Sequence, residues 1–358
     1  MINTLDKIEQ KILNNERLTK EDGLALFASN DLARIGYLAD LVRKRISGDY
    51  VYYNVNCHLN LTNICTALCD FCAFGCEATD KKAYAMTMEQ IYNKVANACK
   101  DPNMKNLHIV SGLHPDWPFS YYVDIIKMLK KEFPQLHLKG FTGVEITHFA
   151  KISGKSIREV LQELKDAGIE AMPGGGAEIL NDEIRAKICP NKANTQEWIE
   201  TIKTAHKLGM KTNASELYGH IETIEQRLQH LFTLREIQDE THGFQAFISF
   251  PFHPQNTQLD NIKPITSYES LRFIAISRLV LDNIPHIKAF WMMLTLPIAQ
   301  LALAFGADDL DGTVEEEQII HAAGAKTGQK MTTAQLQKII TETGYTPVQR
   351  DSLYRKIK

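Results

Sequence analysis

The pattern of hydrophobic and polar positions changes near residue 50. Before it, apolar residues such as Leu5, Ile8 and Ile12 recur at helical spacing among charged ones, which predicts a helical N-terminal extension over residues 1–50. After it, short apolar or β-branched runs alternate with amphipathic stretches. Strands and helices that follow one another in this order are typical of a parallel sheet.

Eight short runs are the strand candidates: residues 57–61, 107–111, 136–141, 169–173, 211–215, 245–250, 287–290 and 308–310. Eight strand–helix units close a TIM-type barrel, so we expect an α/β fold, a (β/α)8 barrel over residues 51–323. An open or partial barrel of six strands is the alternative. Residues 324–358 no longer follow this alternation of strands and helices. They predict one helix (332–343) and an irregular basic tail, a C-terminal segment that caps one end of the barrel.

The helix starts carry a second signal. Thr87, Ser156, Thr223 and Thr266 are each followed three residues later by Glu or Gln, and Asn194 begins a weaker version of this pattern. In a capping box the first side chain accepts a hydrogen bond from the fourth residue's amide, and the fourth side chain accepts one from the first residue's amide. These sites predict where amphipathic helices begin.

Composition and charge narrow the function classes. The chain has 358 residues, and 40 Lys and Arg residues against 43 Asp and Glu residues give a formal net charge of −3. That balance excludes a nucleic-acid binder that depends on bulk positive charge. No stretch approaches the roughly 18 apolar residues of a membrane span, and the N-terminus lacks a signal-peptide pattern. We expect a cytoplasmic protein without nucleic-acid or membrane partners.

Five of the seven cysteines fall within residues 57–76, whereas Cys99 and Cys189 stand apart. Within the cluster, Cys65, Cys69 and Cys72 directly follow the first predicted strand. In parallel barrels the catalytic groups collect at the C-terminal ends of the strands. Three thiolates can ligate three irons of a cube-shaped [4Fe–4S] cluster, which leaves the fourth iron open to another ligand.

Two other metal sites are compatible with these cysteines. A structural zinc site could use Cys76 or His58 as its fourth ligand, although zinc loops usually pair two cysteine hooks and no second hook is present. A four-cysteine electron-transfer cluster could include Cys76. Either site would make the chain a non-catalytic iron–sulfur or zinc protein.

The cysteine loop also resembles that of a known family. Cys65-x-x-x-Cys69-x-Phe71-Cys72 after a first barrel strand resembles the signature of the radical S-adenosylmethionine enzymes. The resemblance implies that the three cysteines hold a [4Fe–4S] cluster, that S-adenosylmethionine binds beside it as a co-substrate, and that a flavodoxin or ferredoxin donates electrons. The residues that it implies for S-adenosylmethionine binding are Phe71, Ala73, Gly112, Glu145, Glu178, Ser215 and Ile221.

Longer segments narrow the resemblance. The branch that contains futalosine-pathway enzymes of menaquinone biosynthesis and the deazaflavin synthases is resembled by four segments, residues 60–63, 72–75, 172–178 and 218–223. Aminofutalosine synthases are resembled by three more, residues 111–116, 282–291 and 306–313. That family adds the 5′-deoxyadenosyl radical to the enol-ether double bond of 3-[(1-carboxyvinyl)oxy]benzoate, which gives aminodeoxyfutalosine, methionine and bicarbonate. Dehypoxanthine futalosine cyclases, which abstract hydrogen instead, and deazaflavin synthases are the alternatives within the branch.

A dianionic aromatic substrate requires cationic or donor groups and an apolar wall. A histidine in a barrel loop is, however, more often structural than catalytic. Asp308, Asp309 and Asp311 lack the spacing of a calcium loop, so we expect them to be caps and loop ligands rather than a metal site. The candidates for the substrate pocket are His114, His148, His220, His253, Arg235, Lys288 and Trp291, with Phe74, Phe250 and Phe252 as further apolar residues.

Overall fold

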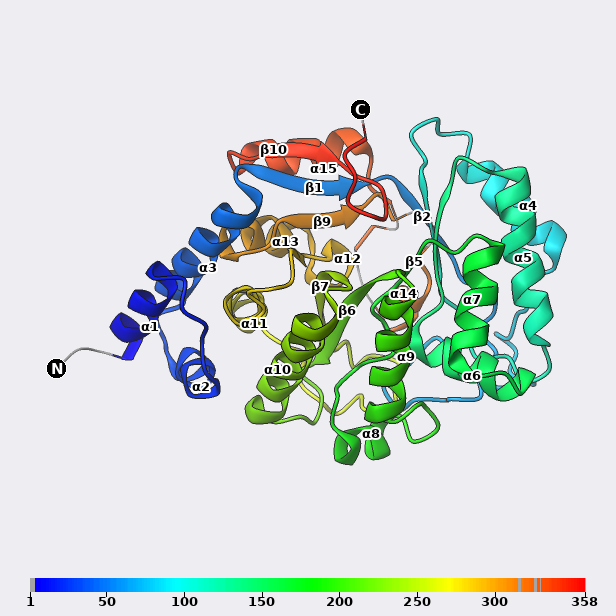
Figure 1. Ribbon diagram of the computed structural model, residues 1–358, viewed down its shortest axis with the longest axis horizontal. Coiled ribbons are helices and arrows are strands. Elements are labelled where there is room, and N and C mark those ends of the chain that lie inside the picture. The colour runs from blue at the N-terminus through cyan, green and yellow to red at the C-terminus, as the bar shows by residue number, and fades with distance from the viewer. Residues whose placement is uncertain (1–3, 315–316, 325–326, 329, 358) are drawn as a thin grey trace.

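The computed structural model describes residues 4–314, 317–324, 327–328 and 330–357, and its strands form one sheet in which every pair is parallel (Figure 1). Their order across the sheet is β10-β1-β9-β8-β7-β6-β5-β4-β3-β2. The strands are β1 (Tyr50–Asn54), β2 (Asn56–Leu59), β3 (Asn106–Ile109), β4 (His137–Gly140), β5 (Ala171–Met172), β6 (Lys211–Tyr218), β7 (Phe244–Pro251), β8 (His286–Lys288), β9 (Asp309–Gly312) and β10 (Thr346–Gln349).

The eight predicted strands correspond to β2 through β9, which confirms the α/β fold of the TIM-barrel type. β1 and β2 are two halves of one extended segment, separated by Val55. β1 pairs with β9 and β10, whereas β2 pairs with β3. Because one continuous segment meets β9 along its first half and β3 along its second, it joins the two ends of the curled sheet.

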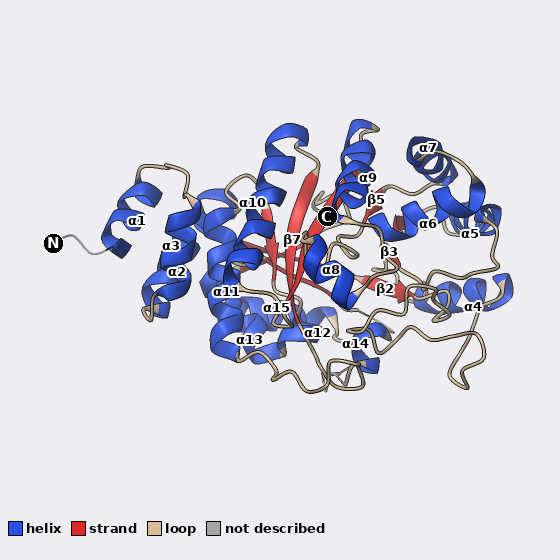
Figure 2. Ribbon diagram, turned by 90° about the horizontal axis from the view of Figure 1, so that it is seen from below, coloured by secondary structure: helices blue, strands red, loops and turns tan. Residues whose placement is uncertain are grey.

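Helices lie around the sheet and cover its outer face (Figure 2). They are α1 (Thr4–Leu13), α2 (Lys20–Ala28), α3 (Leu32–Ser47), α4 (Met88–Ala98), α5 (Phe119–Glu132), α6 (Gly143–Ser153), α7 (Ile157–Ala167), α8 (Asp182–Ile188), α9 (Thr195–Lys207), α10 (Ile224–Thr241), α11 (Ser267–Val280), α12 (Trp291–Leu294), α13 (Leu296–Ala302), the 3-10 helix η1 (Leu303–Phe305), α14 (Ile319–Ala322) and α15 (Thr333–Glu342).

The helix starts follow the predicted capping pattern with one exception. At Thr266 only half of the box forms, because the carboxylate of Glu269 pairs with Arg227 at 3.0 Å instead of accepting from the amide of Thr266. Further boxes begin at Thr19, Thr142 and Thr332. The complete predicted boxes begin at Thr87, Ser156, Asn194 and Thr223.

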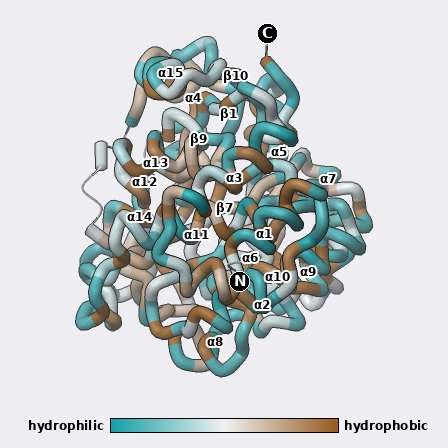
Figure 3. Tube along the Cα trace, turned by 90° about the vertical axis from the view of Figure 1, so that its left-hand side faces the viewer, coloured by the Kyte–Doolittle hydropathy of each residue, from teal (hydrophilic) through white to brown (hydrophobic). Residues whose placement is uncertain are grey.

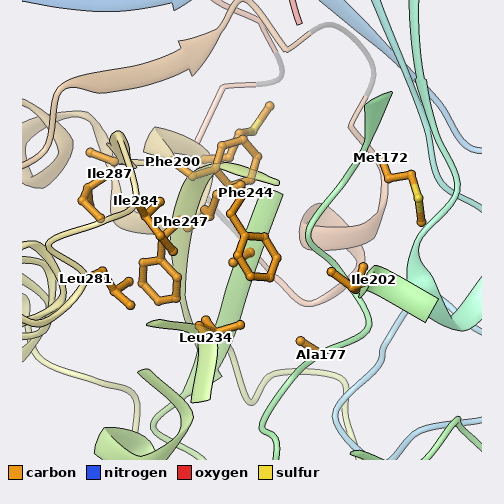
Figure 4. Close-up of a cluster of buried hydrophobic side chains, with 14 of the residues drawn as sticks. Met172, Ala177, Ile202, Leu234, Phe244, Phe247, Leu281, Ile284, Ile287 and Phe290 are labelled. Atoms are coloured by element: carbon orange, nitrogen blue, oxygen red, sulfur yellow. The ribbon is translucent and has the colours of Figure 1, made fainter. Parts of the chain in front are cut away.

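The hydrophobic core lies between the outer face of the sheet and the helices. Hydrophobic and hydrophilic positions alternate along the outer helices (Figure 3), as expected of helices with one buried face. Figure 4 shows Phe244 and Phe247 of β7 among buried side chains from neighbouring strands, helices and connections, such as Leu234 and Ile287. On the other side of β7, Ile248 and Phe250 line the interior of the barrel.

The C-terminal segment crosses the N-terminal end of the barrel. Its helix was predicted, but the tail is not wholly irregular: β10 pairs with β1 as an edge strand. Four residues that include a proline gave no strand signal, and proline is tolerated at a sheet edge. Beyond β10, the Asp351 carboxylate lies 3.5 Å from His137 Nε2 at the start of β4, and the Ser352 carbonyl accepts a hydrogen bond from Gln245 in β7.

The N-terminal helices α1 to α3 form the end of the molecule drawn in blue in Figure 1. α1 packs on α2 and α3, α3 packs on α11, and α2 packs on α10 and α11. Two arginines fix this contact: Arg235 donates to the Leu18 carbonyl at 3.0 Å, and Arg272 donates to the Phe27 carbonyl at 2.7 Å. No helix in the described part of the chain is both long and apolar enough to span a bilayer.

Candidate functional site

A cavity of about 300 Å³ opens at the C-terminal ends of the strands and extends into the barrel. The cysteine loop and the glycine segment 173–176 line its mouth. Its deeper wall is unusually polar for a barrel interior, which apolar side chains normally fill. The polar and charged side chains that reach it from the strands and the C-terminal segment include Asn54, Asn56, His58, Asn60, Asn106, His108, Lys139, Asn213, Lys288, Asp311 and Arg350.

Backbone hydrogen bonds fix the cysteine loop, which begins where β2 ends. The amide of Cys65 donates to the Cys76 carbonyl at 3.0 Å, and the amide of Cys76 donates to the Asn63 carbonyl at 2.9 Å. Cys65, Cys69 and Cys72 line the cavity. Cys76 does not line it; it borders a separate surface pocket.

The three thiols fit a [4Fe–4S] cluster better than a single metal ion. Among the described residues, no three His, Cys, Asp or Glu side chains converge on one point as zinc requires. A cube-shaped cluster needs no such convergence, since it presents a separate iron to each thiolate. Burial raises the pKa of Cys69 to about 12 and raises that of Cys72, so these thiols need a cationic partner such as iron to ionise. The zinc alternative with His58 finds no support, because His58 stacks on His108 inside the barrel.

Lys192, which the sequence reasoning did not select, connects the cysteine loop with Glu178. Its ammonium lies 2.6 Å from the Glu178 carboxylate and 4.9 Å from the centre of the Phe71 ring. Burial disfavours the charge, but Cys69 and Glu178 outweigh burial and raise the pKa of Lys192 well above its ordinary value. All of these residues line the cavity. Lys192 therefore places a positive charge beside Cys69.

Glu145 connects the ends of two neighbouring strands. Its two carboxylate oxygens accept hydrogen bonds from the amides of Ser111, at 2.9 Å, and Thr142, at 2.7 Å. Burial raises the pKa of Glu145 to about 7 although these amides favour the ionised form. Glu145, one of the residues that the resemblance implies for S-adenosylmethionine binding, forms the capping box of α6 together with Thr142.

Gly112 allows the cysteine loop to pack against the end of β3. A Cβ atom at this position would lie 2.4 Å from the Ile64 carbonyl oxygen, and the Gly112 amide donates to the Thr62 carbonyl at 2.9 Å. Of the other implied S-adenosylmethionine residues, Phe71, Ala73, Glu145 and Glu178 line the cavity. Ser215 does not, since its hydroxyl donates to the Gly174 carbonyl, and Ile221 is a partly exposed residue outside the lining.

Of the predicted substrate-pocket residues, His253 and Lys288 line the cavity, as do Phe74, Phe250 and Phe252. His253 Nε2 bonds to the Met293 carbonyl at 3.0 Å. Trp291 is buried behind this wall, where its indole nitrogen donates to the Gly312 carbonyl at 2.9 Å.

The structure places the other predicted pocket residues outside the cavity lining. His114 stacks on Trp117 with ring centres 4.5 Å apart, and His148 Nε2 bonds to the His114 carbonyl at 3.1 Å. His220 Nε2 bonds to the Leu217 carbonyl at 3.0 Å. Arg235, on α10, binds the N-terminal helices. Proximity to a strand end in sequence does not set side-chain direction: the His114 ring accepts from the Asp116 amide, and the other side chains bond to backbone carbonyls.

Asp308 and Asp309 accept hydrogen bonds from backbone amides, as expected of caps, and all three aspartates near β9 also form ion pairs. Asp308 pairs with Arg278 at 2.9 Å and Asp311 with Lys288 at 3.1 Å. Asp309 pairs with Arg350 of the C-terminal segment at 2.5 Å. All of them are buried, so these carboxylates require the cations that long-range folding brings to them.

A periodic signal in the sequence would have found the deeper wall. Residues 54, 56, 58 and 60 are Asn, Asn, His and Asn, and they alternate with apolar or small residues along β1 and β2. Alternate residues of a strand face the same side. A barrel strand whose inward positions are all polar therefore indicates a polar interior.

Comparisons with known proteins agree with this site. The Radical SAM superfamily model matches residues 59–234, and the model of the CofH/MqnC C-terminal region matches residues 241–358. The fold resembles methylornithine synthase (TM-score 0.76, 18% identity, 95% of this chain and 97% of that one) and the FeFe-hydrogenase maturase HydG from Carboxydothermus hydrogenoformans (TM-score 0.76, 16% identity, 98% and 80%).

Full-length relatives are closer in sequence. The aminodeoxyfutalosine synthase of Thermus thermophilus is 43% identical over 98% of this chain and 95% of its own, and that of Streptomyces coelicolor is 44% identical over 98% and 94%. The 5-amino-6-(D-ribitylamino)uracil–L-tyrosine 4-hydroxyphenyl transferase of Methanococcoides burtonii is 40% identical over 95% and 96%. The chain therefore belongs to the radical S-adenosylmethionine superfamily, enzymes that use a [4Fe–4S] cluster and S-adenosylmethionine, in the branch that carries a CofH/MqnC C-terminal region.

Proposed function

We propose that this enzyme is an aminodeoxyfutalosine synthase of menaquinone biosynthesis. The reaction breaks the bond between C5′ and sulfur and joins C5′ to the terminal methylene carbon of 3-[(1-carboxyvinyl)oxy]benzoate. The aryl ring moves from the ether oxygen to the adjacent carbon, and the enol-ether carboxylate leaves as bicarbonate with consumption of one water. The products are 6-amino-6-deoxyfutalosine, methionine and bicarbonate. The observation that carries the proposal is the 43–44% identity to two aminodeoxyfutalosine synthases over 98% of this chain.

The chemistry of the cavity supports the same proposal. When bound, the cluster and S-adenosylmethionine supply the adenosyl radical. Cys65, Cys69 and Cys72 hold the cluster, and Phe71, Gly112 and Glu178 lie around the mouth where S-adenosylmethionine binds. The protein's own contribution is to orient the second substrate and to exclude water. A flavodoxin or ferredoxin donates the electron.

The walls of the cavity suit an aromatic dianion. Phe250 of β7 and Phe290, which follows β8, pack edge to face with ring centres 6.0 Å apart and line one side. Cationic side chains, Lys139, Lys288 and Arg350, line the deeper part. Apolar rings hold an aryl group away from water, and the buried cations provide the attraction for carboxylates.

The second candidate is the tyrosine 4-hydroxyphenyl transferase reaction. The 40% identity to the Methanococcoides burtonii transferase over 95% of this chain favours it almost as strongly. Its substrates, an aminouracil and L-tyrosine, differ so much from the enol-ether benzoate that one assay separates the two reactions.

The test is an anaerobic assay of the reconstituted enzyme with reductant and S-adenosylmethionine. One sample contains the enol-ether benzoate and the other contains the aminouracil with L-tyrosine. We expect an adenosyl adduct of the benzoate by mass spectrometry and no product from the second sample. Free 5′-deoxyadenosine as the sole adenosyl product would contradict the proposal and indicate hydrogen abstraction, as in dehypoxanthine futalosine cyclases.

Single cysteine variants test the cluster site. We expect Cys65→Ala, Cys69→Ala and Cys72→Ala each to reduce turnover by about a thousandfold or more, because each leaves a cluster iron without its thiolate. Cys76→Ala is the matched control, since Cys76 lies outside the cavity lining, and it should retain activity and iron content. Loss of the cluster in Cys76→Ala would instead favour a four-cysteine site.

A further inference from the structure

Below the cysteine loop, the cavity wall contains a row of three polar side chains. His58 of β2, His108 of β3 and Lys139 of β4 are register partners across adjacent strands. All three line the cavity, and the two imidazole rings stack with their centres 4.6 Å apart. The cysteine loop follows the C-terminal end of β2, so this row lies deeper in the barrel than the cluster site.

Lys139 differs from the other buried cations of the cavity. Lys288 pairs with Asp311, and Arg350 pairs with Asp309. Lys139 is only 6% exposed, yet within residues 4–314, 317–324, 327–328 and 330–357 no hydrogen bond or ion pair is found for its ammonium. These buried groups therefore comprise three basic side chains, Lys139, Lys288 and Arg350, and two carboxylates, Asp309 and Asp311.

The surroundings of Lys139 do not supply the missing anion. Burial, together with the positive charges of Lys288 and Arg350, lowers its pKa well below the ordinary lysine value. Burial also lowers the pKa of His58 and of His108, so both rings are neutral near pH 7. Asn213 of β6, 2% exposed, lines the same cavity, and its side-chain oxygen Oδ1 has no hydrogen-bond partner in the described chain. Buried polar groups normally have partners.

We propose that Lys139 binds the ring carboxylate of the aromatic substrate. This role rests on the function proposed above. The enol-ether carbon must lie at the mouth of the cavity, near the cysteine loop and Glu178, because the adenosyl radical forms there. The ring carboxylate is at the far end of the same molecule and therefore points down the barrel. There Lys139 has no counterion of its own, and the bound carboxylate supplies the negative charge that favours the protonated form of its amine.

The test compares Lys139→Met with the wild type in binding and in turnover. Lys139→Met removes the charge and keeps most of the volume. We expect it to weaken binding of 3-[(1-carboxyvinyl)oxy]benzoate, measured by calorimetry, by about 100-fold, the usual scale for one partner of a buried charge pair. Binding of S-adenosylmethionine and the iron content should not change. Lys127→Met is the matched control, because Lys127 is exposed on α5.

A substrate analogue probes the same contact without a mutation. The analogue carries a carboxamide in place of the ring carboxylate. It should bind wild-type enzyme about 100-fold more weakly than the dianion, whereas Lys139→Met should bind both compounds equally. If the wild type binds both equally, or if Lys139→Met still prefers the dianion as the wild type does, the role of Lys139 is refuted. Failure of the wild type to convert the dianion would instead refute the proposed function, and with it this role.

Discussion

At the scale of single residues, the interior of the barrel shows where function has replaced packing. Inward-facing positions of TIM-type barrels are normally filled by branched apolar side chains. Here Asn54, Asn56 and His58 occupy them, while Tyr53 and Cys57 on the other face join the hydrophobic core. Such buried polar groups require partners, from the protein or from a ligand.

Gly112 is a residue whose small size the structure requires. We expect Gly112→Ala to destabilise the fold by about 2 kcal/mol and to lower the iron content per chain, because its Cβ would meet the Ile64 carbonyl and push the cysteine loop outward. Chemical denaturation and iron analysis measure the two effects. Gly328→Ala is the control, since its Cβ would come no closer than 3.9 Å to the Lys330 carbonyl. Normal iron content in Gly112→Ala would refute this role.

His230 makes the stability depend on pH. Its Nδ1 accepts from the Leu180 amide at 2.9 Å, and its Nε2 bonds to the Ser215 carbonyl at 3.0 Å. Burial lowers its pKa from 6.5 to about 3, so the native state resists the proton that the unfolded chain takes up below pH 6.5. The contribution to stability is complete above pH 6.5 and is lost as the pH falls towards 3.

The corresponding test uses His230→Gln, which does not titrate. Between pH 6 and pH 4, the free energy of unfolding of the wild type should fall more steeply than that of the variant, by about 1.4 kcal/mol per pH unit. Urea denaturation at several pH values measures the difference. Equal slopes would show that His230 is already protonated in the native state.

At the scale of elements, the capping boxes connect local sequence to helix position. The Ser156 side chain at the start of α7 accepts a hydrogen bond from the Glu159 amide, and the Glu159 side chain accepts one from the Ser156 amide. We expect Ser156→Ala to lower the free energy of unfolding by about 1 kcal/mol. Ser156→Asn, which keeps an acceptor at the cap, should cost much less. Equal losses in both variants would show that the cap hydrogen bond is not the cause.

At the scale of the whole molecule, the C-terminal segment completes the barrel. Arg350 places its guanidinium against Asp309 at the start of β9, and both side chains are fully buried. Burial opposes the charge of Arg350, but Asp309 outweighs burial and raises the pKa of Arg350 above its ordinary value. Residues separated by about 40 positions in sequence thus share one buried ion pair.

We expect Arg350→Met to destabilise the protein by about 3–5 kcal/mol, because it leaves the Asp309 carboxylate buried without its partner. The double variant Arg350→Met with Asp309→Asn should recover a large part of this loss. The midpoint of denaturant unfolding measures both. A double variant as unstable as the single one would mean that lost packing, rather than the uncompensated charge, explains the effect.

The sequence by itself determined the parts of this protein that local chemistry fixes. Short apolar or β-branched runs between amphipathic stretches predicted β2 through β9, and capping residues predicted the starts of four helices completely. The spacing of Cys65, Cys69 and Cys72 on one loop predicted side chains that line the mouth. Each of these signals lies within a few neighbouring residues, where backbone geometry alone sets which side chains can act together.

Only the tertiary structure decided which distant charges meet. It brought Lys139, Arg350 and Lys192 to the cavity. It placed His148, His220 and Arg235 on backbone carbonyls outside the cavity lining, and His114 on the Asp116 amide. It also made β10 a strand, since four residues pair with β1 only when the C-terminal segment crosses the barrel. Side-chain direction and long-range pairing depend on how strands are placed in register, and no local pattern in the chain encodes that placement.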